Sequence, residues 1–367
     1  MFKHIRQEIN NDERIYGLDL MRAIAACLIV YLHGNTILEN ISPTLACIPI
    51  PDGVDLFFAL SGFLIGGIIL REINKEEKIG FSFVKRFLVR RWFRTLPNYY
   101  LFLGINILLI YTGLVKDGVL NKYLSTFFVF FQNFNKPYDF LFWESWSLSV
   151  EEWFYFSFPV LLVLGGVLMR RNKKLLFIFA AALFIVFSTL MRVMKAPLEN
   201  FTFENWDLWV RKPVVCRFDG IGYGLVAAWF CFYYYQVWKK SALALFLLGL
   251  SIFVFLLQLG LDYNHYFSET WYFSLFAIAS ACLLPLAEQT KKTKTKIGKC
   301  VIFISVISYS LYLCNRGVVA ALIMNNFDYR NHPGIFYLVY WFTVIVFSAL
   351  VYNYFERPFT NLRERFK

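Results

Sequence analysis

The feature that most restricts the fold of this chain is a series of long apolar segments, each long enough to cross a lipid bilayer. A helix needs about 20 mostly apolar residues to span the hydrocarbon core. The composition agrees, because 58% of the residues are hydrophobic and only 17% are charged, whereas soluble domains are less apolar and more charged. The sequence therefore predicts an all-α polytopic membrane protein with ten spans, near residues 16–36, 53–71, 96–114, 153–169, 175–192, 214–236, 241–260, 270–288, 300–323 and 335–355.

The distribution of basic residues predicts which loops face the cytoplasm. With ten spans, six basic clusters that hold 26 of the 37 Lys and Arg residues fall on one side, which the positive-inside rule makes cytoplasmic. The loops 37–52 and 261–269, on the other side, contain neither Lys nor Arg. The net charge of +12 thus follows from topology, and no nucleic acid partner is needed to explain it. We expect a membrane domain at 16–355 between two cytoplasmic tails, 1–15 and 356–367.

Three smaller features complete the predicted organisation. The apolar run 124–131 is too short to cross the membrane, so we interpret it as a re-entrant or interfacial segment. The first hydrophobic segment lacks a small-residue cleavage site and is expected to stay as a helix. The seven cysteines form no CxxC pair, so the sequence predicts neither a metal site nor a disulfide framework.

Two ionisable residues lie inside the first predicted span. Charges inside spans are costly, so they are candidates for function. Arg22 and His33 are eleven residues apart, which at about 100° per residue places both on one helix face, about 16 Å apart along the axis. Each residue could instead have a purely structural role. An arginine near a span end can snorkel to the headgroups, and a lone histidine can be a hydrogen-bonded packing residue.

Other polar residues sort by the direction of their spans into two layers. Ser61, Gly62, Gly66 and Gly67 in the second span are interpreted as helix-packing residues. The inner layer holds Arg22, Arg86, Arg90, Arg91 and Arg94, and the outer layer holds His33, Asp55, Glu151, Arg217, Asp219, Asn315 and Arg316. Inner arginines suit phosphate groups, and a histidine beside a carboxylate suits general base catalysis. A purely structural network in the outer layer, and a purely topological role for the inner arginines, remain alternatives.

The same residues carry a resemblance to acyltransferase family 3, the integral-membrane O-acyltransferases that modify bacterial cell-surface glycans. The arginine at 22 followed by the histidine at 33 resembles the opening motif of that family. The further matching runs, in chain order, are GVDLFFALSGFLI from Gly53, RRWFRTLP from Arg90, WSLSVE from Trp146 with Phe154-Tyr155 after it, ISYSLYL from Ile307 and YNYFERP from Tyr352. Each run alone is weak, but together they cover nearly the whole chain in order.

The sequence departs from the family pattern in two places. Many members carry Trp-His after the ISYSLYL run, whereas this chain has Cys314-Asn315, so a second base or proton relay is not expected there. Some members carry an appended extracytoplasmic hydrolase-like domain, and the given sequence has none after its tenth span. We therefore expect the spans alone to deliver the acyl group.

The resemblance implies an O-acyltransferase in the bacterial inner membrane, with acetyl-CoA as a cytoplasmic donor and a surface glycan as acceptor. An alcohol needs a base to take its proton, so we expect His33 to be that base, or else to carry the acyl group itself. Asp55 or Glu151 would orient the imidazole or hold acceptor hydroxyls, and Arg22 would place the donor or stabilise the oxyanion. Arg90, Arg91 and Arg94 are expected at the CoA phosphates, and the expected acceptor-binding residues are Trp146, Ser147, Arg217, Asp219 and Asn315.

A different class of function fits part of the same pattern. Ten spans with intramembrane charges also suit a transporter or flippase of a lipid-linked or other anionic substrate. No pair of helices broken by Gly or Pro marks a midplane site in the two halves of the chain, which counts against transport. O-antigen, capsule, exopolysaccharide and enterobacterial glycan all stay open as acceptors, as does the choice between acetyl and another short acyl group. We expect no permanently bound cofactor and no metal.

Overall fold

The computed structural model describes residues 3–9, 11, 13–75, 79–135, 141–168, 172–196, 202–259, 266–293 and 295–362, and all regular secondary structure in these ranges is helical. Long helices occupy the ten predicted positions and confirm the all-α polytopic fold. They are α2 (Tyr16–His33), α5 (Gly53–Lys75), α6 (Phe81–Tyr111), α8 (Ser145–Leu168), α9 (Lys173–Lys195), α11 (Phe218–Tyr233), α13 (Ala242–Leu259), α15 (Tyr272–Gln289), α16 (Lys296–Cys314) and α18 (Pro333–Val351).

Eight spans within the described residues are long and apolar enough to cross a membrane. The two remaining helices, α6 and α11, fill the third and sixth predicted positions. Helix α11 has only 16 residues, and α6 carries a basic first half, so its mean hydropathy is low. Helix α6 begins at Phe81, about 15 residues before the predicted start of the third span near residue 96. Arginine and lysine are good helix formers, so the basic stretch before Leu96 continues the helix instead of forming a loop.

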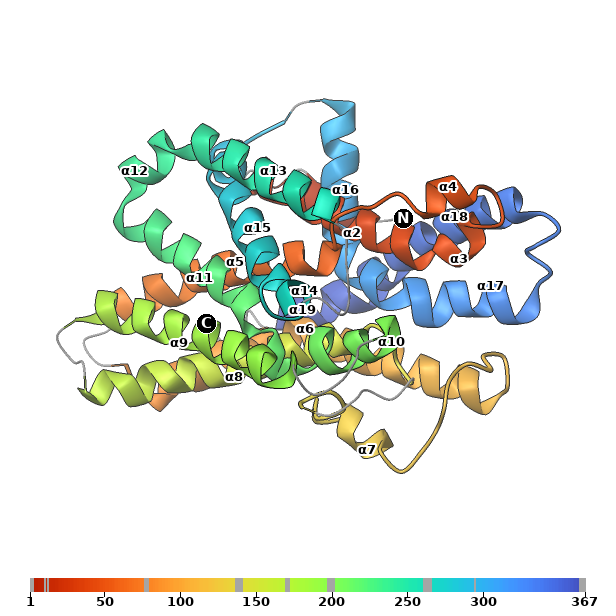
Figure 1. Ribbon diagram of the computed structural model, residues 1–367, viewed down its shortest axis with the longest axis horizontal. Coiled ribbons are helices and arrows are strands. Elements are labelled where there is room, and N and C mark those ends of the chain that lie inside the picture. The colour runs from red at the N-terminus through yellow and green to blue at the C-terminus, as the bar shows by residue number, and fades with distance from the viewer. Residues whose placement is uncertain are drawn as a thin grey trace.

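The short helices and connecting segments gather at two ends of the bundle. In Figure 1, α3 (Asn35–Leu38), α4 (Pro43–Ala46) and α17 (Ala321–Asn326) lie at one edge of the molecule, and α12 (Tyr235–Lys240) lies at the opposite edge. Backbone hydrogen bonds join the ends that carry the basic clusters, for example from Tyr16 N to Lys291 O at 3.1 Å. This bond places the start of α2 beside the chain that follows α15.

Helix α5 packs closely against α11 through glycines on both helices. A side chain at Gly62 would overlap the carbonyl oxygen of Ile221, and one at Gly224 would overlap the carbonyl oxygen of Ala59. Small residues at such positions let two backbones approach, which is how helices associate in membranes. Gly62 therefore has the packing role that the sequence indicates, and the α5–α11 pair forms a rigid wall beside the site described below.

We expect Gly224→Ala to destabilise the protein by about 1–3 kcal/mol, because the methyl group meets backbone atoms that cannot move aside. Gly104→Ala in α6 is the matched control, since nothing lies within 4 Å of its added methyl group. That variant should be neutral or gain up to about 1 kcal/mol from helix propensity. Unfolding of the detergent-solubilised variants measures the difference, and equal transitions for both would contradict the close-packing interpretation.

The apolar run 124–131 does not cross the membrane as a helix. Only Leu124–Phe127 is helical (α7), and Phe130 turns the chain with φ of 59°. The segment is held against α6 and α8 by three bonds to its carbonyl oxygens: Tyr99 donates to Phe127 O at 2.7 Å, Tyr100 to Phe128 O at 2.9 Å, and Trp153 to Phe130 O at 2.9 Å.

Candidate active site

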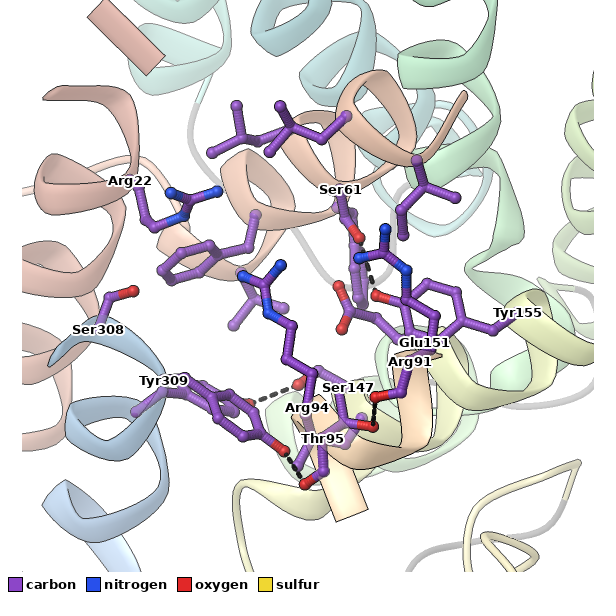
Figure 2. Close-up of a pocket in the computed structure, with 18 residues that line it drawn as sticks. Arg22, Ser61, Arg91, Arg94, Thr95, Ser147, Glu151, Tyr155, Ser308 and Tyr309 are labelled. Atoms are coloured by element: carbon purple, nitrogen blue, oxygen red, sulfur yellow. Dashed lines mark hydrogen bonds between the residues drawn. The ribbon is translucent and has the colours of Figure 1, made fainter. Parts of the chain in front are cut away.

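A pocket of about 130 Å³, called here the central pocket, lies inside the bundle between α2, α5, α6, α8 and α16. Its walls combine apolar side chains, mainly from α5, with polar side chains from the other helices. Figure 2 shows the guanidinium groups of Arg22, Arg91 and Arg94 and the carboxylate of Glu151 reaching into this space. The remaining lining residues are Val54, Phe57, Phe58, Leu60, Ser61, Leu64, Ile65, Thr95, Ser147, Leu148, Tyr155, Ser308, Tyr309 and Tyr312.

The charges in the central pocket follow from helical spacing. Arg91 and Arg94 are three residues apart on α6 and both line the pocket. Arg90, one turn before Arg94, is exposed and does not line it. Ser147 and Glu151 on α8 are four residues apart and likewise share a face. Three guanidinium groups thus face one carboxylate, and this excess of positive charge suits an anionic ligand.

Glu151 lies in a different layer from the one that the sequence predicts. It faces Arg91 and Arg94 and interacts with the hydroxyls of Ser61 and Tyr155, so the assignment of Glu151 to the outer layer is wrong. The reason is depth, because Glu151 lies nearly two turns inside α8, which begins at Ser145.

A wider cavity of about 430 Å³, called here the mouth, adjoins the central pocket on the side of the basic clusters. Both spaces are lined by Arg22, Leu64, Arg94, Ser308 and Tyr309, so they meet around these residues. The mouth adds two cations and four carboxylates near its rim: Arg14, Arg357, Glu8, Glu13, Asp19 and Glu356.

Contacts at the mouth hold its polar residues in place. Arg14 hydrogen-bonds Asp19, and it pairs with Glu8 at 3.1 Å. Glu8 also pairs with Arg357 at 2.8 Å. Arg22 lies 3.5 Å from Asp19 and from the hydroxyl of Ser305. A continuous polar passage therefore leads from the rim of the mouth to Arg22 and Arg94, where the central pocket begins.

His33 lies at the far end of α2 from the mouth, and its ring nitrogen Nδ1 hydrogen-bonds Oδ1 of Asn315. The Nδ2 group of Asn315 donates to the carbonyl oxygens of Leu311 at 2.9 Å and Tyr312 at 2.8 Å. These bonds fix the amide orientation, so Oδ1 must accept from the imidazole. In the neutral ring the proton therefore sits on Nδ1, and Nε2 keeps a lone pair that can take a proton.

The structure gives the orienting role at His33 to Asn315, not to Asp55 or Glu151. Asn315 begins η4 (Asn315–Ala320), a π-helical turn at the end of α16. Such turns interrupt the regular hydrogen-bond ladder and are frequent at functional sites. The asparagine that stands at the family's usual histidine position is thus a direct partner of His33.

The central pocket ends toward His33 at a hydrogen-bonded pair of hydroxyls. Ser147 and Tyr312 lie 2.6 Å apart, and Tyr312 donates to the carbonyl oxygen of Glu144 at 2.9 Å. Asn315 follows Tyr312 by three residues, about 4.5 Å further along α16. The Ser147–Tyr312 pair therefore lies between the central pocket and Asn315.

Glu144 is a buried acidic residue that the sequence analysis does not single out. Its Oε1 accepts the backbone N–H groups of Arg316 and Gly317, both at 2.9 Å. Burial raises the pKa of Glu144 to about 7 although these bonds oppose the shift. Glu144 thus anchors the turn that presents Asn315 to His33. Its place just before the WSLSVE run was the only sequence signal, because its partners lie far along the chain.

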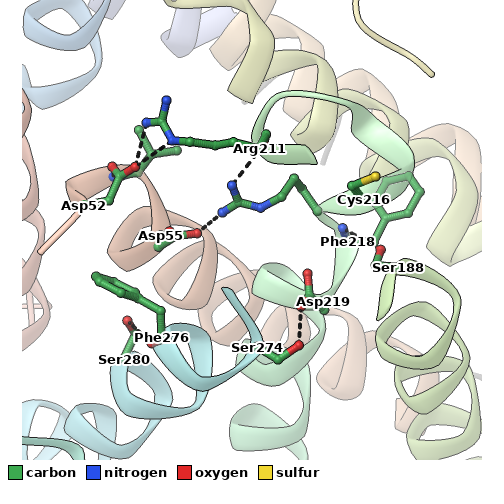
Figure 3. A network of polar contacts seen from close by, with 12 residues as sticks. Asp52, Asp55, Ser188, Arg211, Cys216, Phe218, Asp219, Ser274, Phe276 and Ser280 are labelled. Carbon is green, nitrogen blue, oxygen red and sulfur yellow. Dashed lines mark hydrogen bonds and ion pairs between the residues drawn. The ribbon is translucent and has the colours of Figure 1, made fainter. Parts of the chain in front are cut away.

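A separate network of buried ion pairs lies beside the site. Arg217 pairs with Asp55, and Arg192 pairs with Asp219 at 2.6 Å. Ser274 donates to Asp219 at 2.8 Å. Figure 3 shows Asp55 and Asp219 within this network. Neither carboxylate lines the central pocket or the mouth. The structure instead pairs Asp55 with Arg217 and Asp219 with Arg192.

Further ion pairs lie at the outer ends of the helices. Asp52 accepts from Arg211 at 2.6 Å, and Arg211 also pairs with Asp207 at 2.7 Å. Burial alone would raise the pKa of Asp52, but the Arg211 guanidinium outweighs it and holds that pKa below its usual range. The Arg211 guanidinium lies over the ring of Trp146 at 4.9 Å. Trp146 is 4% exposed and acts as a packing platform between this pair and the wall of the central pocket.

Fold and site together define a multi-pass membrane protein with a cationic cavity that leads toward a histidine on the opposite side. The sequence profile described as "Acyltransferase domain" matches residues 15–353, nearly the whole chain. The chain therefore belongs to this acyltransferase family, as the motifs indicate.

The relatives of the chain carry related names. O-acetyltransferase OatA of Staphylococcus aureus is 26% identical over 365 residues, which cover 93% of this chain and 56% of OatA. YrhL of Bacillus subtilis, provisionally named a peptidoglycan O-acetyltransferase, is 31% identical over 177 residues, or 44% of this chain and 26% of YrhL. The chain thus spans little more than half the length of the staphylococcal protein. No solved structure matches it.

Proposed function

We propose that this chain is an O-acetyltransferase of the bacterial cytoplasmic membrane that moves acetyl from cytoplasmic acetyl-CoA to a hydroxyl of a cell-surface glycan or its lipid-linked precursor. The observation that carries the proposal is the shared face of α2. Arg22 lies where the mouth meets the central pocket, and His33 lies at the other end of the same helix. Helix α2 thus carries, at one end, an arginine that suits phosphate groups and, at the other end, a histidine that can act as a base.

The geometry supports a donor that enters through the mouth. The phosphates of CoA are anionic, and Arg22 and Arg94, which line both cavities where they join, suit them; Arg91 lines the central pocket alone. About 16 Å of helix separates Arg22 from His33. An acetyl group held near those arginines cannot cross that distance by itself, whereas the long uncharged arm of CoA can. The apolar wall of α5, with Val54, Phe57 and Leu60, suits this arm.

The chemistry then falls to His33. The acceptor oxygen attacks the thioester carbonyl while Nε2 of His33 takes the hydroxyl proton, and the carbon–sulfur bond breaks as the intermediate collapses. The imidazolium returns the proton to the departing CoA sulfur. Asn315 holds Nδ1–H throughout, which keeps Nε2 as the basic atom. In the covalent variant, Nε2 attacks the thioester and expels the CoA thiolate. The acceptor oxygen then attacks the acyl-imidazole, the acyl–nitrogen bond breaks, and the freed Nε2 takes the hydroxyl proton and passes it to the thiolate.

The acceptor class rests on the relatives and on the polar outer end of the site. YrhL carries peptidoglycan in its provisional name, so peptidoglycan joins O-antigen, capsule and exopolysaccharide among the glycans to test. Ser147 and the Asp52–Arg211 pair supply hydrogen-bonding groups on that side.

The test of this function uses membranes that contain the protein and acetyl-CoA labelled in its acetyl group. We expect label to appear in glycan only when the protein is present and when acceptor and donor lie on opposite faces of sealed vesicles. Movement of a lipid-linked substrate across the vesicle without acetyl transfer would instead identify a transporter.

A further inference from the structure

Arg316 differs from the buried arginines on the outer side of the bundle, because each of those has a carboxylate partner. Arg192 and Arg217 have aspartate partners, and Arg211 has two. Lys212 pairs with Asp207 at 2.5 Å. Among the described residues, the guanidinium of Arg316 makes no ion pair with a carboxylate, and its one hydrogen-bond contact is a weak one to the sulfur of Met324 at 3.9 Å.

The surroundings of Arg316 hold this free cation in a defined place. Its guanidinium lies over the ring of Trp143 at 5.2 Å, and the ammonium of Lys212 lies over the same ring at 5.5 Å. Its backbone N–H is fixed by Glu144. Glu144 accepts two backbone N–H groups through Oε1, and no ion pair joins its second oxygen, Oε2, to Arg316. Asp117 accepts from Asn325 at 3.3 Å.

Arg316 is also next to the proposed base. It follows Asn315, the hydrogen-bond partner of His33, and its charge acts electrostatically on the imidazole. A partly buried guanidinium without a partner is costly unless a ligand supplies the missing anion. A carboxylate or phosphate is the group that a guanidinium binds best, through two parallel hydrogen bonds.

From this geometry we propose that Arg316, with Trp143 beneath it, binds an anionic group of the acceptor and so selects acidic acceptors whose hydroxyl then lies at His33. The proposal rests on the acetyltransferase function argued above and narrows its substrate class. The anion is either the carboxylate of an acidic sugar or a phosphate that joins the sugar to its lipid.

The experiment compares three acceptors with the full chain in lipid nanodiscs: dodecyl glucoside, dodecyl glucuronide, and glucose joined to dodecanol by a phosphodiester. We expect one anionic acceptor to be preferred over the glucoside at least about tenfold in kcat/KM, because a charge-assisted bidentate contact is lost with the neutral sugar. Preference for the glucuronide assigns the anion to the sugar, and preference for the phosphodiester assigns it to the linkage.

Variants of Arg316 test whether this residue causes the preference for an anionic acceptor. Arg316→Gln should bring the preference close to one, while Arg316→Lys should keep part of it. Arg330→Gln is the matched control, because Arg330 is an exposed arginine of the same outer side that also lies over an aromatic ring, that of Tyr329 at 5.8 Å. It should keep the full preference.

The readout separates failure of this proposal from failure of the proposed function. If no acceptor is acetylated, binding of the three probes is measured directly by the shift in the unfolding transition. Equal binding or equal kcat/KM for all three with the wild-type chain overturns the anionic site. An unchanged preference in Arg316→Gln overturns it as well, provided that the variant remains monodisperse.

Discussion

His33→Ala should reduce acetyl transfer by about 10²–10⁴-fold, because the reaction loses the base that takes the acceptor proton. The structure sharpens this expectation. Asn315 fixes the ring so that Nε2 carries the lone pair, and alanine has no atom that can take a proton in its place. The measurement is the initial rate of label transfer from acetyl-CoA to glycan at saturating donor.

Two controls separate catalysis from folding in this experiment. His33→Ala loses one hydrogen bond, worth about 1 kcal/mol, so the variant should still insert and remain monodisperse. His332→Ala, which changes an exposed histidine at the start of α18, should keep wild-type activity. If His33→Ala keeps more than about a tenth of the rate, base catalysis by this residue is wrong at that magnitude.

The covalent variant of the mechanism requires its own observation. If His33 carries the acyl group, label from acetyl-CoA must appear on the protein before acceptor is added, and it must disappear when acceptor arrives. Rapid quenching of the nanodisc-embedded chain detects this species. Absence of label on the protein at times when transfer to acceptor is complete would leave direct attack with His33 as base.

The membrane fold could be predicted from the sequence because length, hydropathy and loop charge are local properties. Each span is long enough to be recognised alone, and the basic clusters fix the order of directions. The start of α6 could not be placed in this way, because charge suggested a loop where the structure has a helix from Phe81. Arg91 and Arg94 can lie on that helix inside the protein because the mouth and the central pocket receive them.

The site was harder to predict, because its contacts join residues that are far apart in sequence. Periodicity alone put Arg22 and His33 on one face of α2. It could not reveal that Asn315, 282 residues from His33, orients the imidazole, nor that Glu144 anchors the turn of Asn315. Intramembrane charge marked Asp55 and Arg217 as candidates, but the structure pairs them with each other. The free-energy cost of a charge inside the membrane therefore indicates that the residue needs a partner. Only the tertiary structure shows whether that partner is another residue or is left to the substrate.

The second large effect is expected on the KM for acetyl-CoA. Arg94 and Arg90, one helical turn apart on α6, provide a matched pair of variants. Both are arginines on α6, yet Arg94 lines both cavities and Arg90 lines neither. Arg94→Gln should raise the KM for acetyl-CoA about 10- to 100-fold, since a hydrogen bond to a charged group contributes about 1.5–3 kcal/mol. Arg90→Gln should leave it unchanged. Equal effects of the two substitutions would instead assign the basic stretch to topology alone.

A variant of Arg22 tests whether the inner arginines bind the donor phosphates or stabilise the oxyanion at the thioester carbonyl. A residue that binds the donor phosphates lowers KM, whereas a residue that stabilises the oxyanion raises kcat. Because Arg22 lies about 16 Å along α2 from His33, its guanidinium belongs with the phosphates and not with the thioester carbonyl. Arg22→Ala should therefore recover activity at high acetyl-CoA concentration, in contrast to His33→Ala. If Arg22→Ala stays inactive at every donor concentration while the protein remains folded, the thioester itself lies in the central pocket, and the acceptor must then pass the Ser147–Tyr312 pair to reach it.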